Sequence, residues 1–163
     1  MKKWISHIVL PVALLAALLA VASCVGLDSV RKMRVVSHRI TGVRMPEPGS
    51  RTLGVTLLMQ VENPAGYVRM SDIAGEIRSD KLTLGTFAAD DLSVEARCTK
   101  DYAVTLWLTP AADVSLFRLM ALLKDFRPED YVFDVSVNLS AVPQSKGGRY
   151  VIKNQPIKAL FQR

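Results

Sequence analysis

Cys98 and His38 are the side chains whose types are suited to covalent chemistry, because a thiolate can attack a carbonyl and an imidazole can take its proton. Each has a simpler interpretation. His38 is a lone histidine in a strand-like stretch, and Cys98 continues the apolar alternation of residues 91–98, as a small hydrophobic residue does. The pattern of two cysteines and two histidines that binds zinc is missing, as are the Gly-x-Ser-x-Gly and phosphate-loop motifs. We therefore expect no enzyme, no metal and no cofactor.

Two acidic pairs, Asp90-Asp91 and Glu129-Asp130, are the other residues with catalytic potential. General acid–base work needs two carboxylates that face one pocket. Adjacent residues on a strand point to opposite faces. Both pairs are therefore interpreted as parts of turns and helix flanks.

The second cysteine, Cys24, lies at the end of an apolar run that begins near Trp4 and follows two lysines. A basic head, an apolar core and small residues before a cleavage point are typical of an export signal. The four residues from Val21 to Cys24 resemble the bacterial lipobox, an aliphatic residue and two small residues before a cysteine. The resemblance implies cleavage between Ser23 and Cys24 and acylation of Cys24, which would insert into membrane lipid.

This interpretation divides the chain into a lipoprotein signal peptide (1–23, an N-terminal signal helix), a lipidated tether (24–32) and a single domain (33–163). An uncleaved transmembrane helix over 4–25 is an alternative, since about 20 apolar residues span a bilayer. An ordinary secretory signal is another. The lipoprotein and the uncleaved-helix interpretations both place the domain in the cell envelope. Val25 stands where inner-membrane retention signals have aspartate, which favours the outer membrane, on the periplasmic side.

The chain is basic, with a formal net charge of +6. Export argues against nucleic acid as the partner, so we expect the cations to meet anionic lipid or to be solvated. Arg31, Lys32 and Arg34 lie just after the anchor, Cys24. If Cys24 carries lipid, Cys98 has no partner within the chain, and a disulfide framework is excluded.

Period-2 alternation predicts an all-β domain of about seven strands. The clearest strand is 51–62, which Asn63-Pro64 ends. In 33–45 the pattern places Val36 and Ile40 on one face and Val43 on the other, with a bulge at Gly42. The remaining predicted strands are 67–79, 81–88, 91–98, 102–109, 131–141 and 149–161. One α-helix is expected at about 112–125, where Leu116, Leu119, Met120 and Leu123 share a face. Strands without βαβ alternation favour an antiparallel sandwich.

The order of these elements resembles the late-embryogenesis-abundant group 2 family, also described as the water-stress and hypersensitive-response domain. The resemblance rests on the strand Val55–Val61 that runs into Glu62-Asn63-Pro64. It is supported by Ile73-x-Gly75-x-Ile77, by Leu82-Thr83-Leu84-Gly85 and by the hairpin before the single helix. It covers roughly residues 33–161. It implies an immunoglobulin- or fibronectin-III-like sandwich, a structural role for Asn63 and Pro64, no established catalytic residues and an association with desiccation stress.

Three aromatic residues are candidates for surface binding of a partner or a hydrophobic ligand: Trp107, Tyr67 and Tyr150. Trp107 is out of phase with the apolar face of its strand, and the helix could cover it. We expect a non-enzymatic, lipid-anchored envelope protein that binds or protects. The alternative is an accessory subunit of an envelope transport or outer-membrane maintenance complex.

Overall fold

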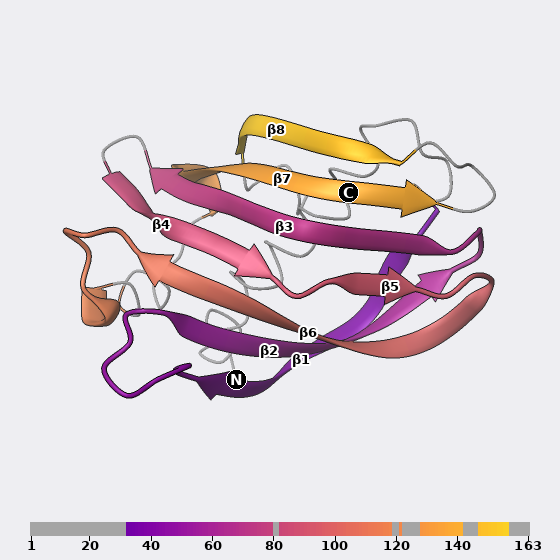
Figure 1. Cartoon of the computed structure of the whole chain (residues 1–163), viewed down its shortest axis with the longest axis horizontal. Coiled ribbons are helices and arrows are strands. Elements are labelled where there is room, and N and C mark those ends of the chain that lie inside the picture. The colour runs from indigo at the N-terminus through magenta and orange to yellow at the C-terminus, as the bar shows by residue number, and fades with distance from the viewer. Residues whose placement is uncertain (1–31, 80–81, 119–120, 122–127, 142–146, 157–163) are drawn as a thin grey trace.

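The computed structural model describes residues 32–79, 82–118, 121, 128–141 and 147–156 (Figure 1). They form eight antiparallel strands, a 3₁₀ turn at Pro128–Asp130 and one short α-helix, of which residues 116–118 and 121 are described. The strands are β1 (Arg34–Arg44), β2 (Leu53–Asn63), β3 (Val68–Ser79), β4 (Leu82–Ala89), β5 (Leu92–Val94), β6 (Cys98–Pro110), β7 (Tyr131–Ala141) and β8 (Gly148–Pro156). The predicted all-β class is confirmed.

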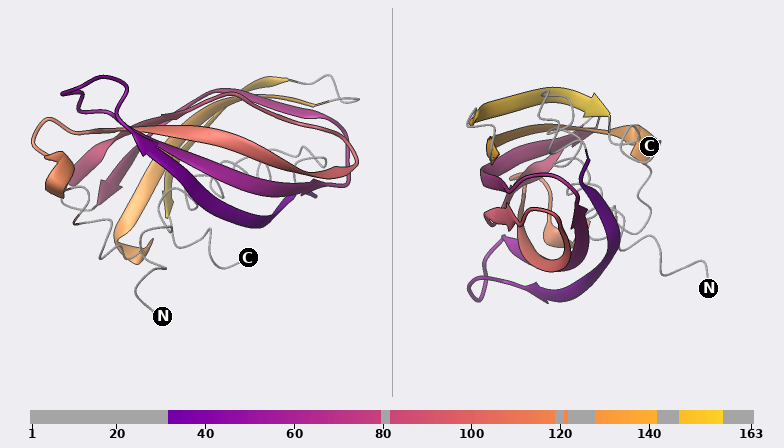
Figure 2. Two further views of the ribbon diagram at one scale, coloured as in Figure 1. Left: turned by 90° about the horizontal axis from the view of Figure 1, so that it is seen from below. Right: turned by 90° about the vertical axis from the view of Figure 1, so that its right-hand side faces the viewer.

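The strands follow one hydrogen-bonded path, β1-β2-β6-β4-β3-β7-β8, with β5 paired to the start of β3. Strand β4 pairs with both β6 and β3, so the sheet folds back at β4 into two facing layers. Figure 2 (right) shows this curl from the yellow β8 round to the indigo β1. The two edge strands, β1 and β8, therefore lie on the same side of the molecule, opposite β4.

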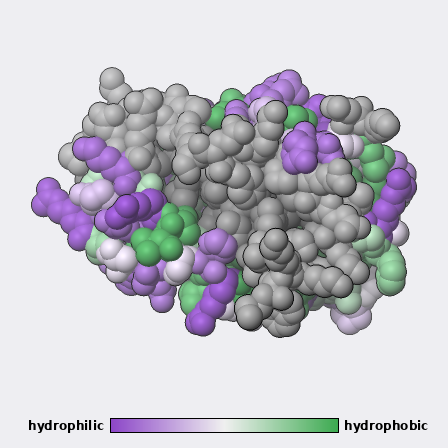
Figure 3. Space-filling view, turned by 180° about the vertical axis from the view of Figure 1, so that it is seen from behind, coloured by the Kyte–Doolittle hydropathy of each residue, from purple (hydrophilic) through white to green (hydrophobic). Residues whose placement is uncertain are grey.

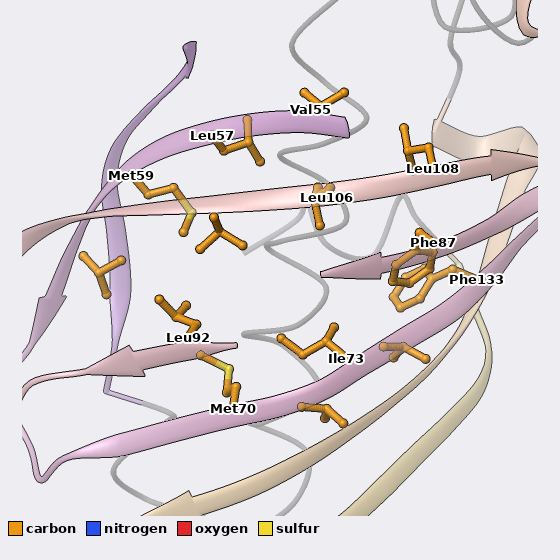
Figure 4. Close-up of a cluster of buried hydrophobic side chains, with 14 of the residues drawn as sticks. Val55, Leu57, Met59, Met70, Ile73, Phe87, Leu92, Leu106, Leu108 and Phe133 are labelled. Atoms are coloured by element: carbon orange, nitrogen blue, oxygen red, sulfur yellow. The ribbon is translucent and has the colours of Figure 1, made fainter. Parts of the chain in front are cut away.

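The core lies between the two layers, because every second residue of the inner strands points inward. Leu57 and Met59 of β2 face Met70 and Phe133 of β3 and β7 (Figure 4), and all four are at most 1% exposed. Burying such a side chain contributes about 1.5 to 3 kcal/mol. The alternation read from the sequence in 51–62 and 131–141 is thus the inner face of β2 and β7.

The stretch 91–98, predicted as one strand, is two elements in the structure. Strand β5 ends at Val94, and Cys98 begins β6 after a turn in which Arg97 has a φ of 52°. This left-handed residue interrupts the alternation. Cys98 is therefore not a fully buried hydrophobic residue of that strand; it is half-buried at the start of the next.

The predicted phase of the first strand was also wrong. The register of β1 against β2 shifts between Val35 and Ser37 and between Ile40 and Gly42. The second shift confirms the predicted bulge at Gly42. The first was not predicted, and it leaves Val36 53% exposed while Val35 packs against the core.

The expected signal peptide, the tether as far as residue 31, and residues 119–120 and 122–125 of the expected helix lie outside the described residues. Within the expected helix, residues 112–115 form a turn and an irregular segment in place of helix. Among the described residues, no helix is long and apolar enough to cross a membrane.

Candidate functional site

Trp107 lies on the outer face of β6, above the backbone of Gly54 in β2. A Cβ atom at Gly54 would come within 2.7 Å of the indole ring, so only glycine leaves room for it. The indole Nε1 donates a hydrogen bond to Asp90 Oδ1 at 3.1 Å. The guanidinium of Arg44 lies 5.0 Å from the ring centroid, a cation–π distance. The half-buried ring is thus held between a cation and a carboxylate.

Whether the expected helix covers Trp107 depends in part on residues 119–120 and 122–125, which lie outside the described residues. The residues that hold the ring come from β1, β2 and the end of β4, and the ring fills the space above a glycine, as aromatic residues often do on sheets. Thr105, its neighbour on the same outer face, bonds Thr56 through the hydroxyls at 3.2 Å. The packing of Trp107 over Gly54 therefore has a structural role, and the half-buried indole keeps part of its surface open to a partner.

The three candidate aromatics do not form one surface. Tyr67 precedes β3 beside the turn that ends β2, whereas Trp107 pairs with Gly54 at the start of β2. The length of β2 separates them, about 30 Å at 3.3 Å per residue. Tyr150 lies in β8 and packs against the core. Within the part of the chain that the structure describes, Trp107 is the one of the three with polar partners arranged around it that could orient a ligand.

Asn63 is fully buried and satisfies its side chain with three hydrogen bonds. Its Nδ2 donates to the carbonyls of Gly66 and Glu95, both at 2.8 Å, and its Oδ1 accepts from the amide of Ala65 at 3.0 Å. The side chain thereby joins the β2–β3 turn to the turn between β5 and β6. Pro64 is exposed and follows directly, where it ends the strand.

Cys98 and His38 do not come together. His38 pairs with Met59, which pairs with Tyr102, whereas Cys98 pairs with Asn63. The two residues are separated by two strand spacings, about 10 Å, and by four residues along the strands, about 13 Å. The Cys98 thiol donates instead to the Glu95 carbonyl at 3.5 Å. A Cys–His pair is excluded by this register.

The carboxylates of Asp90 and Asp91 also act separately. Asp90 binds Trp107, and Asp91 accepts from Arg69 Nη2 at 3.1 Å. Within the described residues, no group of three or more histidine, cysteine or acidic side chains could hold a metal ion.

The edge strands carry a feature that the sequence reasoning missed. Five exposed cations lie in β1 and β8, and neither strand contains an acidic residue. We call these five residues the cationic edge: Arg34, Arg39, Arg44, Arg149 and Lys153. The signal is present in the sequence, since residues 29–46 contain five cations and no aspartate or glutamate.

Two bulges place the arginines of β1 on one face. Residues five apart normally point to opposite sides of a strand, and each bulge adds one residue that restores the phase. Arg34, Arg39 and Arg44 thus pair with Glu62, Leu58 and Gly54, which share the outer face of β2. Arg34 Nε bonds Glu62 at 2.6 Å, and this hydrogen bond raises the pKa of the guanidinium.

No protein-family profile matches the sequence, and no curated protein matches it significantly. Among solved structures, the chain is similar to a protein from Archaeoglobus fulgidus, with 13% identity and a TM-score of 0.39 over 73% of this chain and 91% of that one. It is similar to AT1g01470 of Arabidopsis thaliana, a late-embryogenesis-abundant group 2 protein, with 12% identity and a TM-score of 0.33 over 74% and 78%. It is also similar to the GAE domain of yeast GGA1, with 10% identity and a TM-score of 0.27 over 75% of this chain and 97% of that one. These likenesses are too distant to support a function.

Proposed function

We propose that the chain is a non-enzymatic, lipid-anchored binding domain of the cell envelope, facing the periplasm and attached to the outer membrane. The observation that carries this proposal is the lipobox-like sequence from Val21 to Cys24 at the end of an export-signal pattern. Strand β1 begins at Arg34, soon after Cys24. An extended chain spans at most about 3.6 Å per residue, so the tether would keep β1 within about 35 Å of the anchor.

Binding is favoured over catalysis by the arrangement of the reactive side chains. Cys98 and His38 are apart, and the two neighbouring aspartates each hold a different structural partner. The binding partner would be an envelope protein or a hydrophobic ligand. Protection during desiccation or osmotic stress is the role implied by the family resemblance, which rests mainly on the strand that runs into Asn63-Pro64.

An accessory subunit of an envelope assembly is the second candidate. The half-exposed Trp107 between Arg44 and Asp90 favours it, because tryptophan with oriented polar neighbours is frequent at the centre of protein interfaces. Replacing Trp107 by Ala should then abolish co-purification with one envelope protein. Induction of the chain by osmotic stress, with no stable partner, would favour the protective role.

The anchor is tested by the intact mass of the membrane-extracted protein, beside Cys24→Ala. We expect the mass of residues 24–163 plus acyl groups, and loss of this species and of membrane retention in the variant. A mass that still contains residues 1–23 would contradict lipidation and indicate an uncleaved helix.

A further inference from the structure

We propose that the two edge strands form a docking surface for an anionic lipid bilayer, so that the domain lies on the membrane with β1 and β8 toward the headgroups. This inference rests on the proposed membrane attachment and adds the orientation of the domain. The surface consists of the cationic edge and of the exposed apolar side chains in or directly after the same two strands.

The charges of the sheet are segregated between edge and interior strands. The interior strands β2 to β7 hold three cations, Arg69, Arg78 and Lys100, and each bonds a carboxylate. Of the five cations in the cationic edge, Arg34 alone has an ion pair among the described residues, and Arg44 lies over the Trp107 ring, which leaves Arg39, Arg149 and Lys153 without such a partner there. Cations without a carboxylate partner are available to phosphate groups, which attract basic residues close to an anionic surface.

The same strands carry most of the exposed apolar surface. Five large hydrophobic side chains are exposed among the described residues, and four belong to the edge strands or follow them directly. Val36 and Val43 in β1 are 53% and 61% exposed, Met45 after β1 is 53% exposed, and Val151 in β8 is 54% exposed. Apolar residues among cations are the composition of interfacial membrane-binding segments.

The fold brings these residues to one side. Because the sheet folds back at β4, β1 and β8 border the side opposite that strand. Their side chains flank this side from both layers: Arg39 and Arg44 project from the outer face beside β2, and Arg149 and Val151 from the outer face beside β7. Figure 3 views this side and shows hydrophobic and hydrophilic residues interspersed around its margin. Among the described strands, β1 and β8 each have a neighbour on one side only. Hydrocarbon does not tolerate unpaired backbone groups, so the strands would lie at headgroup depth, where water remains.

A lipid bilayer is favoured as the partner of this surface over a protein that pairs one of its own β-strands with the sheet edge. Both edge strands are irregular, with two register shifts in β1 and one in β8, beside Asn154 at a φ of 55°. Such bulges, together with the edge Lys153 and Pro156, hinder pairing with a further strand. Diffuse attraction to headgroups needs no regular backbone edge.

The test uses the full chain reconstituted in vesicles, with a single environment-sensitive fluorophore in a Cys98→Ser background. The label is attached at Val43→Cys in β1 or at Val151→Cys in β8. The control is Thr86→Cys, an exposed position on β4 at the opposite side of the sheet. Vesicles contain phosphatidylcholine alone or with phosphatidylglycerol, and a nitroxide lipid at headgroup depth serves as the quencher. Thermal melts verify that each variant is folded.

We expect quenching at positions 43 and 151 in the anionic vesicles, little at position 86, and loss of the difference in neutral vesicles or high salt. Equal quenching at all three positions would overturn the proposal. The proposal would also be overturned if the nitroxide lipid did not quench the labels at positions 43 and 151. Quenching by aqueous iodide would then show that the labels face water, and protection from iodide would show that protein covers them. The intact mass of the same sample reports separately whether Cys24 is acylated, so failure of the anchor and failure of the docking surface are distinguishable.

Charge reversal gives a second measurement. Each cation near an anionic surface changes the docked-to-undocked ratio about fivefold, so Arg39→Glu should lower it about 25-fold. The matched control is Arg97→Glu, an exposed arginine in the β5–β6 turn. Equal loss of quenching in both variants would contradict a surface confined to the edge strands.

Discussion

The interior and edge strands of this sheet differ in how they use charged and apolar residues. In β3 and β6, Arg69, Arg78 and Lys100 bond carboxylates of neighbouring strands or turns. Strands β1 and β8 have no acidic residue and expose their cations beside large apolar side chains. Pairing within the sheet stabilises the fold locally, whereas unpaired cations at an edge contribute little to folding and can act on a partner. The difference separates the residues that hold the domain together from those proposed to position it.

Matched methionines give the largest expected difference between the two regions. Met59 in β2 is 1% exposed, and Met45, next to β1, is 53% exposed. Met59→Ala should lower the free energy of unfolding by about 3 to 4 kcal/mol, because it leaves a cavity in the core. Met45→Ala should change it by less than about 0.5 kcal/mol. Urea denaturation measures both, and similar losses would remove the distinction between interior and edge.

Asn63 tests the buried polar connection at the end of the interior strand β2. Asn63→Ala leaves two carbonyls and one amide without their partner, so we expect a loss of about 2 to 3 kcal/mol. Asn138→Ala, which removes a single exposed hydrogen bond to Asp72, is the control and should cost under about 1 kcal/mol. Equal effects would show that the Asn63 contacts do not hold the turns together.

The paired and unpaired arginines can be compared directly. Arg78 bonds Asp134 and Asn154, both at 2.8 Å, from a half-buried position. Arg78→Met should reduce stability by about 1 to 2 kcal/mol, since it leaves Asp134 without its cation. Arg39→Met should leave stability within about 0.5 kcal/mol of wild type. A destabilisation by Arg39→Met as large as that of Arg78→Met would contradict a purely surface role for the edge arginine.

The smallest expected effect is a pH dependence of the free energy of unfolding, which Tyr102 in the interior strand β6 contributes. Burial is the main cause that raises its pKa above the ordinary value of 10.0. The folded chain then holds this proton longer than the unfolded chain, so the stability it contributes is present below pH 10 and is lost as pH rises through the folded pKa. We expect the free energy of unfolding to fall above about pH 10, and less steeply in Tyr102→Phe. An identical slope in the variant would assign the alkaline loss to other groups.

The interior strands were easier to predict than the edges. Strict alternation in 51–62 and 131–141 reflects strands packed on one inner face, so local pattern and tertiary structure agree there. In β1 the first bulge reversed the phase of Val36, because an edge strand with one neighbour is less constrained by packing. The break between β5 and β6 depends on Arg97 and on the bond from Asn63 to Glu95, which is remote in sequence.

The candidate site was predictable only in part. Trp107 was identified by its phase, but Gly54, Arg44 and Asp90 surround it through pairings of distant strands that the sequence does not specify. The structural role of Asn63 followed from the family resemblance, and the three bonds that give it this role required the fold. The absence of acidic residues from the edge strands was visible in the sequence, but the placement of both edges on one side was not.

Hydrogen–deuterium exchange of the full chain in anionic and neutral vesicles tests most directly whether edge and interior strands have these different roles. We predict slower exchange in Arg34–Arg44 and Gly148–Pro156 when phosphatidylglycerol is present, with β3 and β7 unchanged. Uniform protection of all strands, or exchange in β1 and β8 that is independent of lipid charge, would contradict it.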